Sequence, residues 1–267
     1  MEIFSLKNKV AIVTGALGLL GKKHCEALAE AGANVIVTDI DEKGCKLFSK
    51  SLKTQSEGFA LDVTNKESIQ NLLEKVLFEF NKVDILINNA AINDMVENPH
   101  NALEESKFEN YTLSKWQHSI DVNLTGTFLC SQIIGNQMVK QGKGNIINIA
   151  STYGVVAPNQ NLYKDKNGKQ IFYKPPAYSV TKGAVISFTK YLASYWADKN
   201  IRVNCLSPGG VKNNQNEDFI SEYEKRTPLG RMANPEDYKG AIVFLASDAS
   251  NYMTGENLIV DGGWTTW

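Results

Sequence analysis

The sequence predicts an α/β fold in which a doubly wound, seven-stranded parallel sheet is covered by helices on both faces within a single domain. Short β-rich runs alternate with longer stretches of helical period along the whole chain. Several of the short runs are apolar almost throughout, namely VAIVT, VIVTD, VDILIN and NIINIA, as expected of parallel strands buried on both faces. The chain has 267 residues, of which 43% are hydrophobic, and it shows no internal repeat or low-complexity linker, which favours one large domain.

The predicted elements follow one another as strand and helix along the chain. Each predicted strand is a short run of apolar and β-branched residues, and each predicted helix is a longer segment of helical period. The strands are 9–14, 34–39, 58–62, 83–88, 145–150, 202–206 and 257–260, and the helices are 19–31, 42–53, 66–80, 115–140, 177–198 and 235–246. This alternation implies right-handed crossovers, so the ligand crevice should lie outside the carboxyl ends of the strands.

Composition and charge argue against several classes of function. A formal net charge of -1 and a pI near 6.3 provide no general attraction to nucleic acid or to an anionic membrane. The start, MEIFSLKNK, has no apolar signal core, and no window is long enough to span a bilayer. We expect a soluble, cytoplasmic protein without a metal, nucleic-acid or membrane partner. The cysteines, which show no spacing typical of disulfides or zinc, are Cys25, Cys45, Cys130 and Cys205.

A glycine-rich turn, TGALGLLG at 14–21, follows the first strand and leads into a helix. Its glycines allow tight turning and close approach of the backbone to a pyrophosphate, and the N–H groups at the helix N-terminus favour the same anion. Such turns also occur for packing reasons, so the motif alone leaves both interpretations open. The expected phosphate contacts are Gly15, Gly18, Leu19, Leu20 and Gly21.

An acidic residue ends the second strand in the sequence VIVTDID. Asp39 lies 25 residues after Thr14, near the offset at which a carboxylate binds the adenosine ribose of a dinucleotide, and Ile40 is included among the expected contacts. A carboxylate here repels a 2′-phosphate, and the glycine loop has no Arg or Lys to attract one. The pattern therefore favours NAD over NADP. The alternative is that Asp39 only caps the next helix.

A tyrosine and a lysine share one face of the predicted helix 177–198. Tyr178 and Lys182 are four residues apart, which places them one turn apart on the same side. A free phenol has a pKa of about 10, too high for efficient acid–base work at neutral pH, and we expect a neighbouring ammonium, with a positively charged oxidised nicotinamide, to lower it. Ser151, at the end of the fifth strand, could hold the substrate oxygen by a hydrogen bond. The pair and the serine together predict an active site beside the dinucleotide.

Motifs along the whole chain resemble those of the short-chain dehydrogenase/reductase family. In chain order they are TGALGLLG, Asp39, Asp62-Val63, NNAA at 88–91, DVNLTG at 121–126, IAS at 149–151, YSVTK at 178–182, SPGG at 207–210 and VDGG at 260–263. The resemblance implies a Rossmann-like fold and NAD-dependent interconversion of a secondary alcohol and a ketone. The cofactor would exchange the hydride while the protein moves the proton. The implied catalytic tetrad is Asn123, Ser151, Tyr178 and Lys182.

The same resemblance assigns further cofactor contacts at the ends of the third, fourth and sixth strands and on the catalytic helix. Those near the adenine and along the cofactor cleft are Asp62, Val63, Asn89, Ala90 and Ala91. Those beside the nicotinamide and its ribose are Pro208, Gly209, Val211, Tyr178 and Lys182. Asn213 stands near the position where the family often has Thr, which leaves the usual diphosphate contact of that residue open.

The glycine spacing departs from the single-domain branch of the family. The loop reads TGxxGxxG, whereas that branch usually has TGxxxGxG, and the observed spacing resembles the extended branch of nucleotide-sugar epimerases and dehydratases. However, only 85 residues follow Lys182, too few for the added substrate domain of the extended branch. We therefore expect the single-domain branch with a locally different phosphate turn.

An insertion separates the catalytic serine from the catalytic tyrosine. Ser151 and Tyr178 are 27 residues apart, about twice the usual spacing in the family. The extra segment, at about 155–176, carries four lysines and a turn-like KNGK at 166–169, which predicts a hairpin lid over the substrate pocket. We expect it to contact an anionic sugar derivative; the alternative is a solvated or subunit-contacting hairpin. The candidate substrate contacts are Tyr153, Lys164, Tyr173 and Lys174.

Three further features are similar to the bacterial subgroup labelled flagellin modification protein A, which is linked to modified sugars of surface glycans. They are the glycine spacing, the insertion ending in KPPAYSVTK, and the run from TPLGRMANPEDY to the VDGGW end. We therefore expect an oxidoreductase acting on a sugar phosphate or a nucleotide sugar. Two other functions stay open: an epimerase- or dehydratase-type reaction with retained NAD, and a non-catalytic dinucleotide-binding regulator. By resemblance, helices 115–140 and 177–198 would form the interface of a homodimer or homotetramer.

Overall fold

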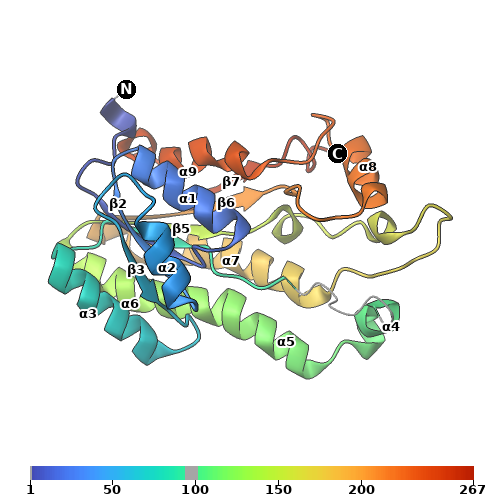
Figure 1. The fold of residues 1–267 in the computed structure, drawn as a ribbon, viewed down its shortest axis with the longest axis horizontal. Coiled ribbons are helices and arrows are strands. Elements are labelled where there is room, and N and C mark those ends of the chain that lie inside the picture. The colour runs from blue at the N-terminus through green and yellow to red at the C-terminus, as the bar shows by residue number, and fades with distance from the viewer. Residues whose placement is uncertain (1, 94–101) are drawn as a thin grey trace.

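Seven parallel strands form the central sheet of the computed structural model, which describes residues 2–93 and 102–267 (Figure 1). The strand order is β3-β2-β1-β4-β5-β6-β7, with every neighbouring pair parallel. The order reverses between β1 and β4, and α/β sheets bind ligands outside the carboxyl ends of the strands at such a switch point. The predicted doubly wound fold is confirmed. The strands are β1 Val10–Thr14, β2 Asn34–Asp39, β3 Glu57–Ala60, β4 Ile85–Asn88, β5 Gly144–Ile149, β6 Ile201–Pro208 and β7 Asn257–Val260.

Helices cover both faces of this sheet (Figure 1). Helices α1, α2 and α9 pack on one face, and α3, α6 and α7 pack on the other. The helices are α1 Leu19–Glu30, α2 Glu42–Ser49, α3 Lys66–Phe80, α4 Ala102–Ser106, α5 Leu113–Ile120, α6 Gly126–Gln141, α7 Pro176–Tyr195, α8 Glu217–Arg226 and α9 Lys239–Ala246.

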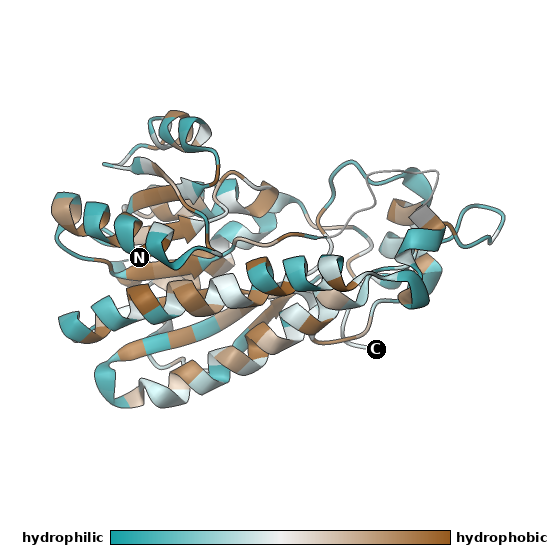
Figure 2. Cartoon of the chain, turned by 90° about the horizontal axis from the view of Figure 1, so that it is seen from below, coloured by the Kyte–Doolittle hydropathy of each residue, from teal (hydrophilic) through white to brown (hydrophobic). Residues whose placement is uncertain are grey.

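Alternate residues of each strand enter opposite faces, which explains why the strands are apolar almost throughout. In β1, Ala11 and Val13 belong to the buried cluster under α1 and α9. Val10 and Ile12 belong to the cluster under α3 and α6. Figure 2 shows the result, with hydrophobic strands inside and helices of mixed hydropathy around them. Burial on both faces thus fixes the sheet without an alternating polar pattern.

Several helices differ from the predicted ones. The predicted helix 115–140 is not one regular α-helix, because a π-helical segment, Asp121–Thr125, joins α5 to α6. The predicted helix 235–246 begins as a 3₁₀ turn, Pro235–Tyr238, before α9. Helices α2 and α7 end earlier than predicted. Helices α4 and α8 were not predicted.

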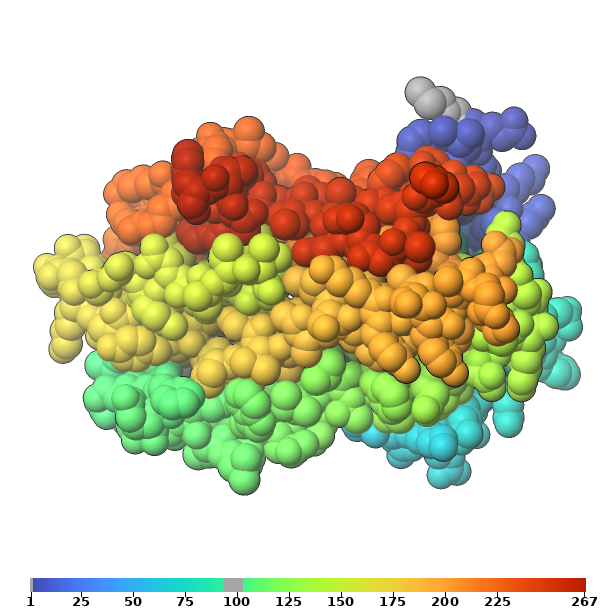
Figure 3. All heavy atoms as spheres, turned by 180° about the vertical axis from the view of Figure 1, so that it is seen from behind, coloured from blue at the N-terminus to red at the C-terminus, as the bar shows by residue number. Residues whose placement is uncertain are grey.

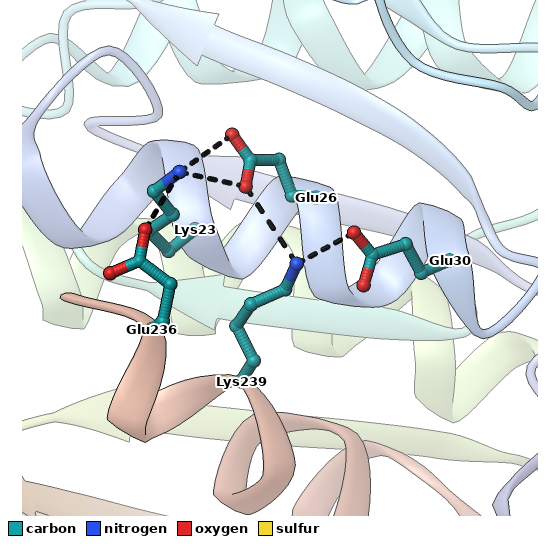
Figure 4. Close-up of polar contacts among 5 residues, drawn as sticks. All are labelled: Lys23, Glu26, Glu30, Glu236 and Lys239. Carbon is teal, nitrogen blue, oxygen red and sulfur yellow. Dashed lines mark hydrogen bonds and ion pairs between the residues drawn. The ribbon is translucent and has the colours of Figure 1, made fainter. Parts of the chain in front are cut away.

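A group of ion pairs ties α1 to the segment that begins α9 (Figure 4). Lys23 on α1 contacts Glu26 at 3.0 Å and Glu236 at 3.2 Å. Lys239 contacts Glu30 at 2.6 Å. Exposed ion pairs typically add only about 0–1 kcal/mol each, so these pairs mainly orient one helix against the other. Because α1 begins at the glycine loop, they help to fix the helix N-terminus at the proposed phosphate site.

Within residues 2–93 and 102–267, no helix combines the length and the hydropathy that a membrane span requires. The same residues hold no group of three or more His, Cys, Asp or Glu side chains arranged to bind a metal ion. The four cysteines are free and buried.

Candidate active site

The glycine loop joins the end of β1 to the N-terminus of α1. Gly15 has a φ of +61°, and a Cβ built there would lie 2.7 Å from a backbone atom of the loop after β4. A Cβ on Gly21 would lie 2.2 Å from the carbonyl oxygen of Gly15. Gly18 is the N-cap of α1 and offers no side chain to the first N–H groups, which belong to Leu19, Leu20 and Gly21. A close-packed turn with free backbone donors fits a pyrophosphate.

A buried threonine and an asparagine fix this loop to the neighbouring strand. The Thr14 hydroxyl accepts hydrogen bonds from the N–H groups of Asn89 and Ala90, both at 3.0 Å. The Asn89 side chain donates to the carbonyl oxygens of Thr14 and Gly15 at 3.0 and 2.9 Å. The side chain of Asn89 therefore holds the ends of β1 and β4 together. Ala91, two residues further along the chain, is exposed.

Asp39, at the end of β2, faces the glycine loop. Its carboxylate accepts hydrogen bonds from the N–H of Leu17 at 3.1 Å and from the N–H of Ile40 at 2.8 Å. The N-cap of α2 is Asp41, whose side chain accepts from the N–H of Gly44, so the alternative that Asp39 caps this helix is wrong. Ile40 is 81% exposed. The end of β2 thus presents a carboxylate and an exposed apolar side chain next to the loop.

The end of β3 carries the predicted adenine contacts. Asp62 is exposed, and its carboxylate accepts hydrogen bonds from the N–H and the hydroxyl of Thr64 at 2.9 and 2.7 Å. Val63 is 8% exposed. It packs against the start of α6, where a Cβ on Gly126 would lie 2.7 Å from its side chain. Val63 is therefore packed against α6, and Asp62 lies on the surface beside it.

The loop after β6 lies at the same edge of the sheet. Pro208 is the last residue of β6. The N–H of Gly209 donates to the carbonyl oxygen of Val260, the last residue of β7, at 2.9 Å. A Cβ on Gly209 would lie 2.7 Å from Asp261 Cα, so glycine permits this close crossing. Val211 forms an isolated parallel bridge with Ala233. Because all strands are parallel, the predicted cofactor contacts at their ends share one carboxyl edge.

Three predicted catalytic side chains come together where β5 ends and α7 begins. Ser151 is 8% exposed, and its hydroxyl accepts a hydrogen bond from the N–H of Tyr153 at 3.2 Å. Tyr178 lies in the first turn of α7, and the Nζ of Lys182 is 5.8 Å from the centroid of its ring. Lys182 is 4% exposed and donates from Nζ to the carbonyl oxygen of Ile149 at 2.7 Å. The four-residue spacing thus brings a buried ammonium to the tyrosine ring.

Burial shifts the pKa values of this pair in opposite directions. Burial raises the pKa of Tyr178 above its usual value, and a side-chain hydrogen bond with Ser151 acts against this. Burial lowers the pKa of Lys182 to about 8, with a smaller opposing effect of Cys205. At pH 7 the lysine therefore keeps its charge and the phenol keeps its proton, because burial outweighs the effect of the ammonium that was predicted to lower the pKa of the phenol. The pair can act as a proton donor with a cation beside it.

Asn123 lies on the π-helical segment between α5 and α6. It is 1% exposed, and its Oδ1 accepts a hydrogen bond from the N–H of Ile92 at 2.8 Å. Its Nδ2 donates to the carbonyl oxygen of Ile92 at 2.9 Å and to the hydroxyl of Thr181 at 3.3 Å. Such segments are frequent at functional sites. Here the asparagine joins the loop after β4 to the catalytic helix α7.

The insertion forms a short hairpin before it returns to α7. Lys164 and Gln170 make an isolated antiparallel bridge, so the predicted turn at 166–169 is present with very short arms. The ring of Tyr163 packs against Phe219 of α8, with the centroids 5.5 Å apart. Figure 3 shows the insertion (yellow) between α8 (orange) and the region of α4 (green). The hairpin is therefore packed against the body of the protein along its flanks.

Two of the four candidate substrate residues contact the tetrad. The Nζ of Lys174 is 4.7 Å from the centroid of the Tyr178 ring, and Tyr153 donates its N–H to Ser151. Lys164 instead takes part in the hairpin bridge, and the N–H of Tyr173 donates to Ser106 at 2.9 Å. Lys174 and Tyr153 thus contact the tetrad, whereas Lys164 contacts another part of the insertion and Tyr173 contacts α4.

A cavity of about 840 Å³ adjoins these side chains. Tyr173 and Lys174 line it from the insertion, and Ser179 and Val180 line it from the first turn of α7, opposite residues of the segment 104–110. Ser151 and Tyr178 are not among the described residues that line it. Lys174 therefore connects the two places, because it lines the cavity and its Nζ lies beside the Tyr178 ring.

Two further residues, Tyr223 and Thr181, contribute to the site and were not predicted. Tyr223 on α8 accepts a hydrogen bond from the N–H of Gly210 at 2.6 Å, and its ring stacks on Trp264 at 4.1 Å. It ties the loop after β6 to the C-terminus, and no motif marked it. Thr181, which bonds Asn123, stands inside YSVTK, and that motif was the signal that could have identified it.

Comparisons with known proteins extend over nearly the whole chain. A family model described as enoyl-(acyl carrier protein) reductase matches residues 15–265. The NAD-dependent glycerol dehydrogenase of Listeria innocua is 34% identical over 267 residues, which cover 98% of this chain and 96% of that protein. A solved short-chain type dehydrogenase/reductase from Mycobacterium marinum is 32% identical, with a TM-score of 0.86 and coverage of 99% and 98% of the two chains.

A solved gluconate 5-dehydrogenase from Burkholderia cenocepacia, in complex with NADP and tartrate, is 28% identical with a TM-score of 0.86, and the match covers 100% of this chain and 98% of that one. The sequence and the fold therefore match along the same full length. The chain belongs to the short-chain dehydrogenase/reductase family, as an NAD(P)-dependent oxidoreductase that acts on alcohol groups.

Proposed function

We propose that this protein uses NAD to interconvert a secondary alcohol and a ketone on a polar, sugar-derived substrate. The observation that supports it most is the position of Tyr178, beside Ser151 and Lys182, at the same carboxyl edge as the glycine loop. A proton-transfer group and a dinucleotide cradle then serve one crevice. Because Asn123, Ser151, Tyr178 and Lys182 are all present, we favour catalysis over a purely regulatory role.

The residues of the tetrad have distinct roles in this proposal. Bound NAD would supply the hydride acceptor. As the phenolate, Tyr178 takes the proton of the substrate hydroxyl in oxidation, and as the phenol it gives that proton to the carbonyl oxygen in reduction. Ser151 holds that oxygen by a hydrogen bond. Lys182 stabilises the phenolate and binds the nicotinamide ribose, and Asn123 keeps the loop after β4 aligned with α7.

The proposed cofactor preference rests on the end of β2. Asp39 faces the glycine loop, so a 2′-phosphate would meet a negative charge there. The residues 14–21 contain no Lys or Arg that could compensate. In the same proposal, the first turn of α1 binds the pyrophosphate, and the crevice wall holds the two ends of the dinucleotide. The proposed wall residues are Ile40, Asp62, Val63, Asn89, Ala90, Ala91, Pro208, Gly209 and Val211.

The proposed substrate class rests on relatives and on the insertion. Two relatives are named for glycerol and gluconate, both of them polyhydroxylated. The insertion adds the cationic side chain of Lys174 beside Tyr178. We place sugar phosphates and nucleotide sugars first, and the resemblance to the flagellin-modification subgroup suggests sugars of surface glycans. The proposal places a homodimer or homotetramer in the cytoplasm.

The test is NADH formation by the purified protein against a panel of neutral sugars and polyols and their phosphorylated and nucleotide-linked forms. We expect turnover with NAD to exceed turnover with NADP. The Tyr178→Phe variant should lose about 10²–10⁴-fold in kcat, because it lacks the proton-transfer group. Tyr252→Phe, on an exposed surface tyrosine, is the matched control and should keep wild-type rates.

Equal rates for the Tyr178→Phe and Tyr252→Phe variants would rule out the assigned role of Tyr178. Consumption of substrate without net NADH, by protein that retains NAD after purification, would instead support the epimerase- or dehydratase-type alternative. NADH binding without any turnover across the panel would count for the regulatory alternative.

A further inference from the structure

The four lysines of the insertion have very different surroundings. Lys166 and Lys169 are exposed near the hairpin turn, and Lys164 is half-buried in the bridge. Lys174 is 6% exposed. Exposed lysines are common on protein surfaces, whereas a buried ammonium carries a desolvation cost of several kcal/mol. Lys174 is therefore the lysine of this segment that is built into the protein interior.

The side chain of Lys174 extends to the acid/base tyrosine. Its Nζ lies 4.7 Å from the centroid of the Tyr178 ring and donates to Oδ1 of Asn93, in the loop after β4. Lys182 approaches the same ring, with its Nζ 5.8 Å from the centroid. Two ammonium groups therefore border one ring, the first from the insertion and the second from α7.

The insertion fixes this position through its backbone. The side-chain Oε1 of Gln160 accepts a hydrogen bond from the N–H of Lys174 at 2.9 Å, and its Nε2 donates to the carbonyl oxygen of Lys174 at 3.3 Å. Gln170 in turn donates to the carbonyl oxygen of Gln160 at 2.8 Å. Both hydrogen-bonding groups of the Lys174 backbone are thus held by one glutamine, and the hairpin supports that glutamine.

We propose that Lys174 makes the pocket selective for substrates that carry an anionic group, a carboxylate or a phosphate, close to the hydroxyl that exchanges its proton with Tyr178. This inference rests on the proposed function of the site. An anion beside Tyr178 would by itself oppose formation of the phenolate, because like charges raise a neighbouring pKa. The charge of Lys174 offsets that effect and binds the anion by a charge-assisted hydrogen bond.

Binding to the enzyme saturated with NADH tests the inference without requiring turnover. Isothermal titration calorimetry would compare D-gluconate and D-glucitol 6-phosphate with neutral D-glucitol. We expect the wild type to bind at least one anion about tenfold or more tightly than glucitol. The Lys174→Met variant should lose about 10–100-fold in affinity for that anion and keep its affinity for glucitol, as removal of a hydrogen bond to a charged group predicts.

Lys166→Met is the matched control, because it removes an exposed charge from the same insertion. Lys174→Gln, which keeps a polar side chain, provides a second variant in case Lys174→Met does not fold. The two anions distinguish a carboxylate site from a phosphate site. A wild type that shows no preference for either anion over glucitol would overturn the proposal, as would equal losses for charged and neutral ligands in both Lys174 variants.

Failure of this inference and failure of the proposed function give different results. If Lys174 has no part in selectivity while Tyr178→Phe still abolishes NAD-dependent turnover, only the inference fails. If the anion preference depends on Lys174 and the protein turns over no member of the panel, the binding role stands and the proposed reaction fails.

Discussion

At the scale of single residues, burial decides the charge states around Tyr178. Burial raises the pKa of Tyr178 and lowers that of Lys182 to about 8, so each shift favours the neutral form. The lysine still carries most of its charge at pH 7, and its Nζ is held by the Ile149 carbonyl oxygen at 2.7 Å. A backbone carbonyl orients the ammonium without cancelling its charge. The charge therefore remains available to stabilise a phenolate.

His24 shows the same effect of burial away from the site, and it predicts acid sensitivity. It is fully buried in α1, and both ring nitrogens lack hydrogen-bond partners among the described residues. Burial lowers its pKa from 6.5 to about 4. As the pH falls through this window, the unfolded imidazole takes up a proton before the folded one. From pH 7 to pH 5, wild-type stability should therefore fall by about 2 kcal/mol more than that of His24→Met.

Urea unfolding at the two pH values measures this difference. His118→Gln, which replaces an exposed histidine, is the matched control. If His24→Met loses stability between pH 7 and pH 5 to the same extent as the wild type, His24 is not the group responsible.

At the scale of elements, the contact of α1 with the glycine loop depends on Gly21. A Cβ there would lie 2.2 Å from the carbonyl oxygen of Gly15 and 2.8 Å from Ala16 Cα, so the backbone must move to accept alanine. We expect Gly21→Ala to lower the free energy of unfolding by about 1–3 kcal/mol and to weaken NADH binding, since the same loop would hold the pyrophosphate. Chemical denaturation and NADH fluorescence titration measure the two effects.

Gly240→Ala in α9 is the matched control for this substitution. A Cβ at Gly240 has no neighbour within 4 Å, and alanine is the better helix former, so stability should rise by up to about 1 kcal/mol. Wild-type NADH affinity in Gly21→Ala would show that the loop does not contact the dinucleotide.

Strand ends could be predicted from the sequence, whereas several helices could not. The apolar runs reveal buried parallel strands directly, and polar or glycine residues after them mark the ligand edge. Helix α8 is largely polar, EDFISEYEKR, and its apolar residues pack only in the folded protein, against the insertion and Trp264. Asn123 on the π-helical segment bonds Ile92 in a distant part of the chain, a contact that helical periodicity does not reveal.

Some positions of the candidate site could likewise be predicted from the sequence, and others could not. Gly15, Asp39 and Lys182 could be predicted because each must stand at a fixed offset from a strand end or a helix turn. The burial of Lys174 could not be separated from the exposure of Lys166 by sequence, since hairpin packing decides it. The hydrogen bonds by which the Asn89 side chain holds the ends of two strands together could not be predicted either, because they join parts of the chain far apart in sequence.

At the scale of the whole molecule, an aromatic surface runs along α6 and α7. Phe128 is 43% exposed, Tyr191 is 61% exposed and Tyr195 is 64% exposed. The rings of Tyr191 and Tyr195 stack with their centroids 5.8 Å apart, and Phe188 stacks on Tyr191 at 6.5 Å. Figure 3 shows that α7 lies at the surface on this side. Contiguous exposed aromatic side chains of this kind are typical of protein–protein contacts.

We expect this aromatic surface to pair with the same surface of a second copy, since isologous contacts between identical patches are the commonest form of homo-oligomer. The double substitution Tyr191→Glu and Tyr195→Glu should shift the protein from dimer or tetramer to monomer in light scattering at micromolar concentration. Charges placed opposite themselves across a two-fold axis repel one another, which adds to the loss of apolar contact. Leu47→Glu, at a position 76% exposed on α2 over the opposite face of the sheet, should leave the assembly unchanged. A wild type that scatters as a monomer, or a double variant that stays assembled, would show that these aromatic residues do not form the interface.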